Sequence, residues 1–187
     1  MGKKSLTLIF SGLLFGLSHQ VVSAGESLLP MRLSINNTTL TRCNRAELKA
    51  FKIIHVGSAA LYLSACSQLP EIFNLSPKRL RFVYERSIPA NAFQEAAVEY
   101  LKLNLGSRYD DWQETIETFN QAYKSVKDGD YYDLKFHPKE GLILALNNTD
   151  LATITDPEIG LAYLNIWFGK EAFSGNLKAS LLKTERL

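Results

Sequence analysis

Residues 45–63, with the sequence RAELKAFKIIHVGSAALYL, decide the fold. From about Ala50 onward nearly every side chain is apolar or small, and the polar exceptions are Lys52, His55, Ser58 and Tyr62. A strand with one exposed face would alternate between apolar and polar residues, and this run does not. The pattern predicts one long strand that is covered on both faces, and therefore a central strand with any pocket lying against it.

Hydrophobic periodicity and turn residues divide the rest of the chain. The further predicted strands cover 31–35, 38–41, 80–86, 131–137, 142–147 and 149–154. The alternation within 80–86 predicts a half-exposed strand. One predicted helix begins near Pro89, and three more cover 110–126, 159–168 and 177–182. Asp156 and Ser174 are the predicted N-caps of the last two helices, and Asn147-Asn148 is the predicted turn between the last two strands.

Strands and helices occur in separate runs along the chain. Strands come first, two helices follow, and more strands and two more helices complete the sequence. This order predicts an α+β domain in which helices cover one face of an antiparallel sheet. Residues 25–187 contain no repeat or linker, so we expect a single domain there.

Residues 1–24 have the features of a signal peptide. Two lysines precede a short apolar run at 6–17, and Val22-Ser23-Ala24 provides the small residues that signal peptidase accepts. The apolar run is too short to span a membrane. We expect a mature protein that begins at Gly25, is exported without a membrane span, and is periplasmic if its source is a Gram-negative bacterium.

The charge balance argues against a nucleic-acid partner. The full chain has 21 basic and 19 acidic residues, and residues 1–24 contain two lysines and no acid, so 19 of each remain. A balanced chain has no overall field that attracts a polyanion. The basic cluster Lys78-Arg79-Leu80-Arg81 is interpreted as the solvent-exposed end of a strand.

The chain has two cysteines, Cys43 and Cys66, and export permits a disulfide between them. If a straight strand joins them, their separation is roughly 75 Å, whereas bridged Cα atoms lie about 5.5 Å apart. A bulge or hairpin near 47–49 would bring them together, so the sequence leaves the bridge open. Two cysteines and two mature histidines fit no zinc-site spacing.

The order of three segments resembles the chalcone isomerase-like family, in its bacterial secreted branch. The similarity covers residues 33–182. It is carried by Arg45 with KIIHVG at 52–57 and ALYL at 60–63, by DYYDL at 130–134 with Gly141, and by NIWFG at 165–169 with NLK at 176–178. The resemblance implies an open-faced β-sandwich, an antiparallel sheet with helices on one face.

The resemblance also implies where catalytic groups would lie. Plant enzymes of this family add a phenoxide to an enone, which needs a cation for the phenolate and hydrogen-bond donors for the enolate. The cation corresponds to Arg45, which is retained. The four donor positions correspond to Gly57, Phe93, Tyr100 and Ile166. Because all four differ from the enzymes, we expect no efficient chalcone isomerase, and Arg45 is the one catalytic candidate.

What remains suits a ligand with an anionic head and an apolar body. An arginine beside a cavity of small and aromatic residues favours such a molecule. The resemblance implies fatty-acid-binding and haem-binding relatives, so a fatty acid or a porphyrin is the expected partner and haem is a candidate cofactor. The candidate binding residues are Arg45, His55, Gly57, Tyr62, Phe93, Tyr100, Ile166 and Trp167.

His55 is the candidate axial ligand if the cofactor is haem. It shares a pocket with Arg45 only if the strand bends, because ten residues of straight strand span roughly 33 Å. The alternatives are that His55 bonds to a backbone carbonyl, that Arg45 neutralises an acid such as Glu47, and that Tyr62 and Trp167 are core residues.

Three functions follow as hypotheses. The first is an exported, non-catalytic binding protein. The second is an intramolecular lyase or isomerase of unknown substrate that uses Arg45, with Tyr100 as a donor. The third is a structural or partner-binding envelope protein that makes contact through the helix face around Trp112, and exposure of Trp112 would favour it.

Overall fold

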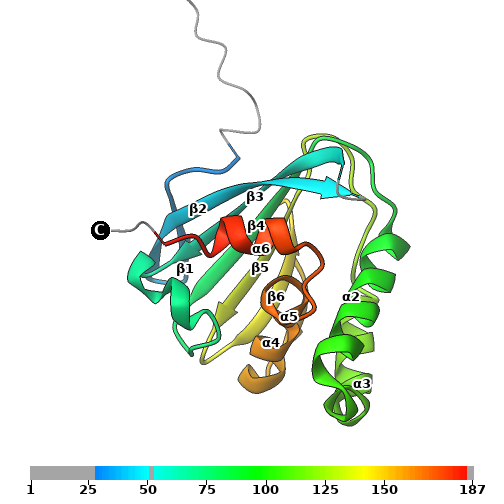
Figure 1. Cartoon of the computed structure of the whole chain (residues 1–187). Helices are drawn as coiled ribbons and strands as arrows, with labels where there is room; N and C mark the ends of the chain where they lie inside the picture. Colours follow the sequence, from blue (N-terminus) through cyan, green and yellow to red (C-terminus); the bar gives the residue numbers. More distant parts are fainter. Residues whose placement is uncertain (1–27, 51–52, 185–187) are drawn as a thin grey trace, which may run out of the picture.

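The computed structural model describes residues 28–50 and 53–184, and the predicted signal peptide lies outside them. Within these residues, seven antiparallel strands pair in chain order to form one curled sheet (Figure 1). This confirms the predicted antiparallel sheet. The strands are β1 (Arg32–Ile35), β2 (Thr38–Ala50), β3 (Ile54–Leu63), β4 (Lys78–Tyr84), β5 (Tyr131–His137), β6 (Gly141–Leu146) and β7 (Thr149–Ile154).

The stretch predicted as one long strand is a hairpin. β2 and β3 pair antiparallel, with Arg45 opposite Ala60 and Lys49 opposite His55. The prediction of a single strand over 45–63 was therefore wrong. The reversal of the chain carries no Gly, Pro or Asn, and both arms of the hairpin bury apolar residues, so the apolar pattern continues through the turn.

The hairpin also joins the two cysteines. Cys43 lies at a bulge in β2, and Cys66 begins the short 3₁₀-helix η1 (Cys66–Glu71) that follows β3. The two residues form a disulfide with a Cα–Cα distance of 5.3 Å. The reversal that permits it lies beyond residue 50, a few residues later than the bend considered at 47–49.

Asparagines form the turn between β6 and β7 as predicted. Asn147 and Asn148 both have positive φ, at 48° and 69°, and connect paired residues Leu146 and Thr149. Two consecutive residues with positive φ are typical of a type I′ hairpin, and asparagine tolerates this conformation. The sequence therefore fixes the register of these two strands locally.

Helices cover one face of the sheet, which confirms the predicted α+β arrangement (Figure 1). Among the described residues, no helix is both long and apolar enough to span a membrane. The helices are α2 (Ala90–Leu105), α3 (Ser107–Asn120), α4 (Pro157–Tyr163), α5 (Asn165–Phe168) and α6 (Gly175–Leu181).

Two predicted helix boundaries need correction. The helix expected at 110–126 begins directly after Gly106 and ends at Asn120, because Val126 instead forms a bridge with Ile88. The helix expected at 159–168 is divided into α4 and α5 at Leu164. The predicted caps are confirmed, since the side chains of Asp156 and Ser174 accept backbone N–H bonds at the starts of α4 and α6.

β4 is buried along its whole length, so its predicted exposed face does not exist. Alternation is present, but both faces are covered. Leu80 and Phe82 belong to the core under the helices, whereas Val83 belongs to a second core on the opposite face. Leu29 and β1 contribute to that second core. The sheet thus lies between two hydrophobic cores, the main core under the helices and the second core on the opposite face.

The predicted exposed basic cluster is also buried. Lys78, Arg79 and Arg81 are 3–6% exposed. Arg79 and Arg81 each donate two hydrogen bonds to Asp133, which is fully buried on β5. Burial alone raises the pKa of Asp133, but the bonds from the two guanidinium groups outweigh it and hold that pKa below its usual value. A sequence pattern of three cations could not reveal a buried acid 52 residues later.

Candidate ligand pocket

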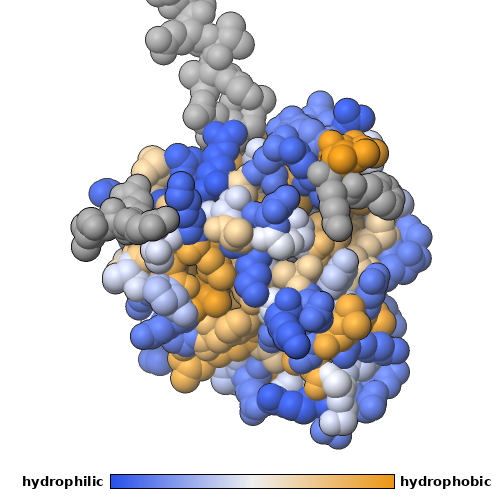
Figure 2. Space-filling model, in the orientation of Figure 1, coloured by the Kyte–Doolittle hydropathy of each residue, from blue (hydrophilic) through white to orange (hydrophobic). Residues whose placement is uncertain are grey.

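A pocket of about 760 Å³ lies between the sheet and the helices. Its walls come from the sheet through residues such as Leu48 and Phe82, from α2 through Phe93 and Ala96, and from α5 through Trp167. Figure 2 shows this face of the molecule, where hydrophobic residues reach the surface between hydrophilic ones. The volume lies within the range of small-molecule sites, roughly 300–1,000 Å³.

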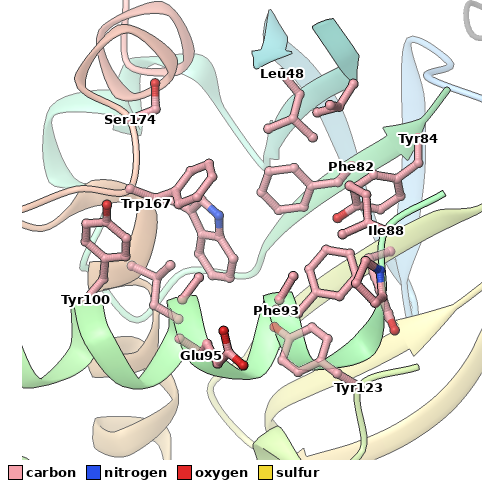
Figure 3. Close-up of a pocket in the computed structure, with 18 of the residues that line it drawn as sticks. Leu48, Phe82, Tyr84, Ile88, Phe93, Glu95, Tyr100, Tyr123, Trp167 and Ser174 are labelled. Carbon is pink, nitrogen blue, oxygen red and sulfur yellow. The ribbon is translucent and has the colours of Figure 1, made fainter. Parts of the chain in front are cut away.

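Aromatic side chains form the interior of the pocket. Phe93 stacks on Tyr123 with ring centroids 5.6 Å apart, and its edge contacts involve Tyr84 and Tyr132. Phe82 and Trp167 lie 5.3 Å apart, on β4 and α5 (Figure 3). Rings from four elements therefore converge on one apolar space.

The tyrosines of this interior are uncharged at neutral pH. Burial raises the pKa of Tyr84 and Tyr123 far above the usual value of about 10. The Tyr132 hydroxyl donates to the Lys124 carbonyl at 2.8 Å and accepts from the Lys124 N–H at 2.7 Å. The interior thus contributes apolar surface rather than an acid or a base.

Charged side chains line the rim of the pocket. Lys49 at the end of β2 and Arg86 after β4 lie on the hairpin side, and Glu95 and Glu99 lie on α2. All four are exposed. The Lys49 ammonium lies 2.9 Å from a Glu47 carboxylate oxygen. A ligand can therefore place its body among the rings and an anionic head beside the two cations.

Four of the predicted binding residues lie together on the wall of this pocket. They are Phe93 and Tyr100 on α2, and Ile166 and Trp167 on α5. The Tyr100 ring also contacts Phe173 at a centroid distance of 5.7 Å. Their role in binding stays a prediction, but their common location does not depend on it.

The other four predicted residues do not line the pocket. Arg45 is exposed on β2, opposite Ala60 of the second core, so its placement at the head of a buried cavity needs correction. Tyr62 also belongs to the second core. The reason is the hairpin: it places Arg45 at the same level as the middle of β3, with its side chain outside the pocket.

Gly57 is small for a reason unrelated to ligand space. A Cβ added there would lie 2.0 Å from the backbone carbonyl oxygen of Val83 on the neighbouring strand. Its φ of +152° is also a conformation that residues with side chains rarely adopt. Gly57 thus allows β3 and β4 to approach each other.

His55 lies between two carboxylates at the surface. Its Nδ1 is 2.9 Å from Glu47 Oε1 and its Nε2 is 2.9 Å from Glu85 Oε2, with 40% of the side chain exposed. Both ring nitrogens therefore have partners outside the pocket. This arrangement does not fit an axial haem ligand, and the described residues contain no cluster of side chains suited to a metal ion.

Trp112 is not the exposed contact that a partner-binding role requires. The side chain is partly buried and packs against the main core. The Arg108 guanidinium lies 4.4 Å from the centre of its ring. The face of α3 around Trp112 is thus explained by packing within the molecule.

Sequence reasoning missed most of the pocket wall. Phe82 and Tyr84 alternate on β4, and that spacing was sufficient to place them on one face. The rim cations Lys49 and Arg86 had no comparable signal, because they meet only when the β2–β3 hairpin lies beside the segment after β4. That segment is held in place by a hydrogen bond from Arg86 Nε to the His55 carbonyl, 2.9 Å.

Comparison with known proteins identifies the family and the fold. A family model described as chalcone isomerase-like matches residues 23–183. Among solved structures, the chain is similar to a fatty-acid binding protein of Arabidopsis thaliana, with a TM-score of 0.57 and 19% identity over 82% of this chain and 90% of that chain. At this identity the likeness shows the fold. No curated protein matches the chain.

Proposed function

This chain belongs to the chalcone isomerase-like family, and we propose that it is a non-catalytic member whose pocket binds a long-chain fatty acid. The observation that carries the proposal is the division between an aromatic interior and a charged rim. An acyl chain gains from burial in the interior at roughly 0.8 kcal/mol per CH₂ group. Its carboxylate stays at the rim, where it keeps contact with water.

The rim provides cations for the carboxylate. Lys49 and Arg86 line the hairpin side of the opening, whereas the acids Glu95 and Glu99 line the α2 side. A carboxylate near the hairpin gains from both cations and stays away from Glu95 and Glu99. The fatty-acid binding function of the Arabidopsis protein supports this ligand class without identifying the chain length.

The absence of catalysis is part of the proposal. Addition of a phenoxide to an enone needs a cation and hydrogen-bond donors close to the reacting atoms. Arg45 lies outside the pocket, and the family's donor positions are Gly57, Phe93, Tyr100 and Ile166, of which Tyr100 alone has a hydroxyl. We therefore expect no chalcone turnover above the uncatalysed rate.

Export is proposed on separate grounds. Residues 1–24 have the sequence features of a signal peptide. The Cys43–Cys66 disulfide supports the same conclusion, since such bonds persist in oxidising compartments. N-terminal sequencing of protein from a periplasmic extract tests it, with Gly25 as the expected first residue.

Displacement of a fluorescent fatty acid tests the binding proposal. Ala96→Trp places a large ring in the pocket wall and should weaken probe binding by about tenfold, or about 1.4 kcal/mol. Leu103→Trp is the matched control on the same helix, because Leu103 is 58% exposed and does not line the pocket. Equal binding by both variants, or no saturable binding by the unmodified protein, would contradict the proposal.

A further inference from the structure

A second hollow of about 320 Å³ lies beside the pocket, between β2 and α6. We call it the head groove. The pocket and the head groove share Lys49, Phe173 and Ser174 in their walls, so they are adjacent. A ligand whose acyl chain fills the pocket would place a large head group in this groove.

The head groove differs from the pocket in its chemistry. Its wall includes Glu47 and Lys49 from β2, and Asn176 and Ser180 from α6. Asn176 and Ser180 are four residues apart and so lie on one side of the helix. Among the described residues, Phe173 contributes the one aromatic ring of its wall, whereas several rings line the pocket. The groove therefore offers hydrogen bonds and charges beside the apolar surface of Phe173 and Leu177.

The charges of the groove have both signs at close distance. The Lys49 ammonium and the Glu47 carboxylate are 2.9 Å apart, and 42% and 51% of their side chains are exposed. The other Glu47 oxygen bonds to His55, which also contacts Glu85. The hydrogen bond with Lys49, followed by that with His55, outweighs partial desolvation and lowers the pKa of Glu47, so its carboxylate is ionised at neutral pH.

This pairing has a consequence for ligand choice. A bare carboxylate beside Lys49 also meets the negative charge of Glu47. A zwitterionic head, with an anionic phosphate ester and a quaternary ammonium, finds an opposite charge for each group. Asn176 and Ser180 add donors for phosphate oxygens.

We propose that the preferred ligand is a single-chain lipid with a zwitterionic head, a lysophospholipid with phosphate and quaternary ammonium groups, whose head lies in the head groove. This inference rests on the proposed acyl-binding function of the pocket and extends its ligand class from free fatty acids to lipids with one acyl chain and a zwitterionic head. The acyl chain occupies the aromatic interior, the phosphate lies beside Lys49, and the ammonium lies beside Glu47.

Glu47→Gln gives a test in which the sign of the effect differs between ligands. Displacement of a fluorescent fatty acid is measured with lysophosphatidylcholine, the free fatty acid and the monoacylglycerol of the same chain length, all below their critical micelle concentrations. The substitution should weaken the binding of lysophosphatidylcholine by about two- to fivefold, as expected for an exposed ion pair. It should strengthen the binding of the free fatty acid. The uncharged monoacylglycerol should not respond.

Glu85→Gln is the matched control. Glu85 contacts the same histidine and is 45% exposed, but it lines neither the pocket nor the head groove. Asn176→Leu should weaken the binding of lysophosphatidylcholine and leave that of the other two ligands unchanged. If Glu47→Gln shifts both charged ligands in one direction, or acts like Glu85→Gln, the head-groove inference is overturned while acyl binding stands. If no ligand displaces the probe, the proposed function itself fails.

Discussion

The two faces of the sheet differ in where they place charged side chains. The helix-covered face encloses a large apolar pocket and keeps its charges at the rim. The opposite face encloses the second core, where Arg79, Arg81 and Asp133 form a buried charge cluster. Buried charges need complete pairing and tight packing, whereas a ligand site needs space. In this molecule the buried arginines stabilise the fold, and the cations available to an anionic ligand lie at the edge of the pocket.

The N-terminal segment closes the charged face. Arg81 Nη1 donates to the Leu28 carbonyl at 2.9 Å, and Arg79 Nη1 donates to the Ser34 carbonyl at 3.2 Å. The Arg81 guanidinium also lies 4.2 Å from the centre of the Tyr131 ring. Because these bonds use the donors that Asp133 leaves over, the segment and the charge cluster stabilise each other.

Among the substitutions that test this difference between the faces, removal of the buried acid should have the largest effect on stability. Asp133→Asn leaves two buried guanidinium groups without a counter-charge and should lower the free energy of unfolding by about 3–5 kcal/mol. Urea denaturation followed by circular dichroism measures it. Asp150→Asn is the control, because Asp150 pairs with Lys135 at the surface and should cost less than about 1 kcal/mol.

The same acid predicts a response to low pH. Because the folded-state pKa of Asp133 lies below its unfolded value, its stabilising contribution is present above the unfolded pKa and is lost as the pH falls through the folded one. Asp133→Asn should remove this part of the acid dependence. An unchanged pH profile in the variant would contradict the assigned ion pairs.

A substitution where two strands meet should have an intermediate effect. Gly57→Ala forces a methyl group against the Val83 carbonyl and should destabilise the fold by about 1–3 kcal/mol. Gly175→Ala is the control, since nothing lies within 4 Å of the added Cβ and alanine favours the helix that begins there. If Gly57→Ala leaves stability unchanged and alters ligand binding instead, the assignment of Gly57 to strand packing is wrong.

The last prediction concerns a buried lysine at the start of β4. Burial lowers the pKa of Lys78 to about 8, although its ammonium donates to the Ser76 carbonyl at 2.8 Å. Between that pH and the unfolded pKa of about 10.5 the unfolded chain binds more protons, so stability should rise with pH by up to about 1.4 kcal/mol per unit.

Lys78→Met isolates this dependence. Tyrosine ionisation affects the original protein and the variant alike, so the difference between their unfolding free energies reports on Lys78. That difference should shift in favour of the original protein as the pH rises from 8 to 10. A constant difference would show that Lys78 stays charged in the folded state, held by the carbonyl oxygens around it.

Local sequence signals predicted elements whose determinants lie close together in the chain. Asn147-Asn148 marked a hairpin turn, and Asp156 and Ser174 marked helix starts, because each acts on backbone groups within a few residues. The order of strands and helices was sufficient for the α+β class. The stretch at 45–63 misled the prediction, because a buried hairpin and a buried strand share one apolar pattern.

The predicted pocket residues show the same difference between local signals and tertiary contacts. Phe93, Tyr100 and Ile166 were found through the positions that the family resemblance implies, and Trp167 is the residue after Ile166; all four lie on helices that line the pocket. Arg45 was misplaced because its position depends on where the chain reverses.

By itself, the sequence determined the helix caps, the asparagine turn, the fold class and the apolar character of the interior, since these depend on neighbouring residues and on hydrophobic periodicity. Only the tertiary structure decided which cations are buried, that Cys43 meets Cys66, and that Lys49 and Arg86 stand at the rim. Each of these outcomes depends on residues brought together by strand pairing. A pairing partner distant in the chain leaves no mark on the local pattern, and that is the physical reason the sequence could not specify them.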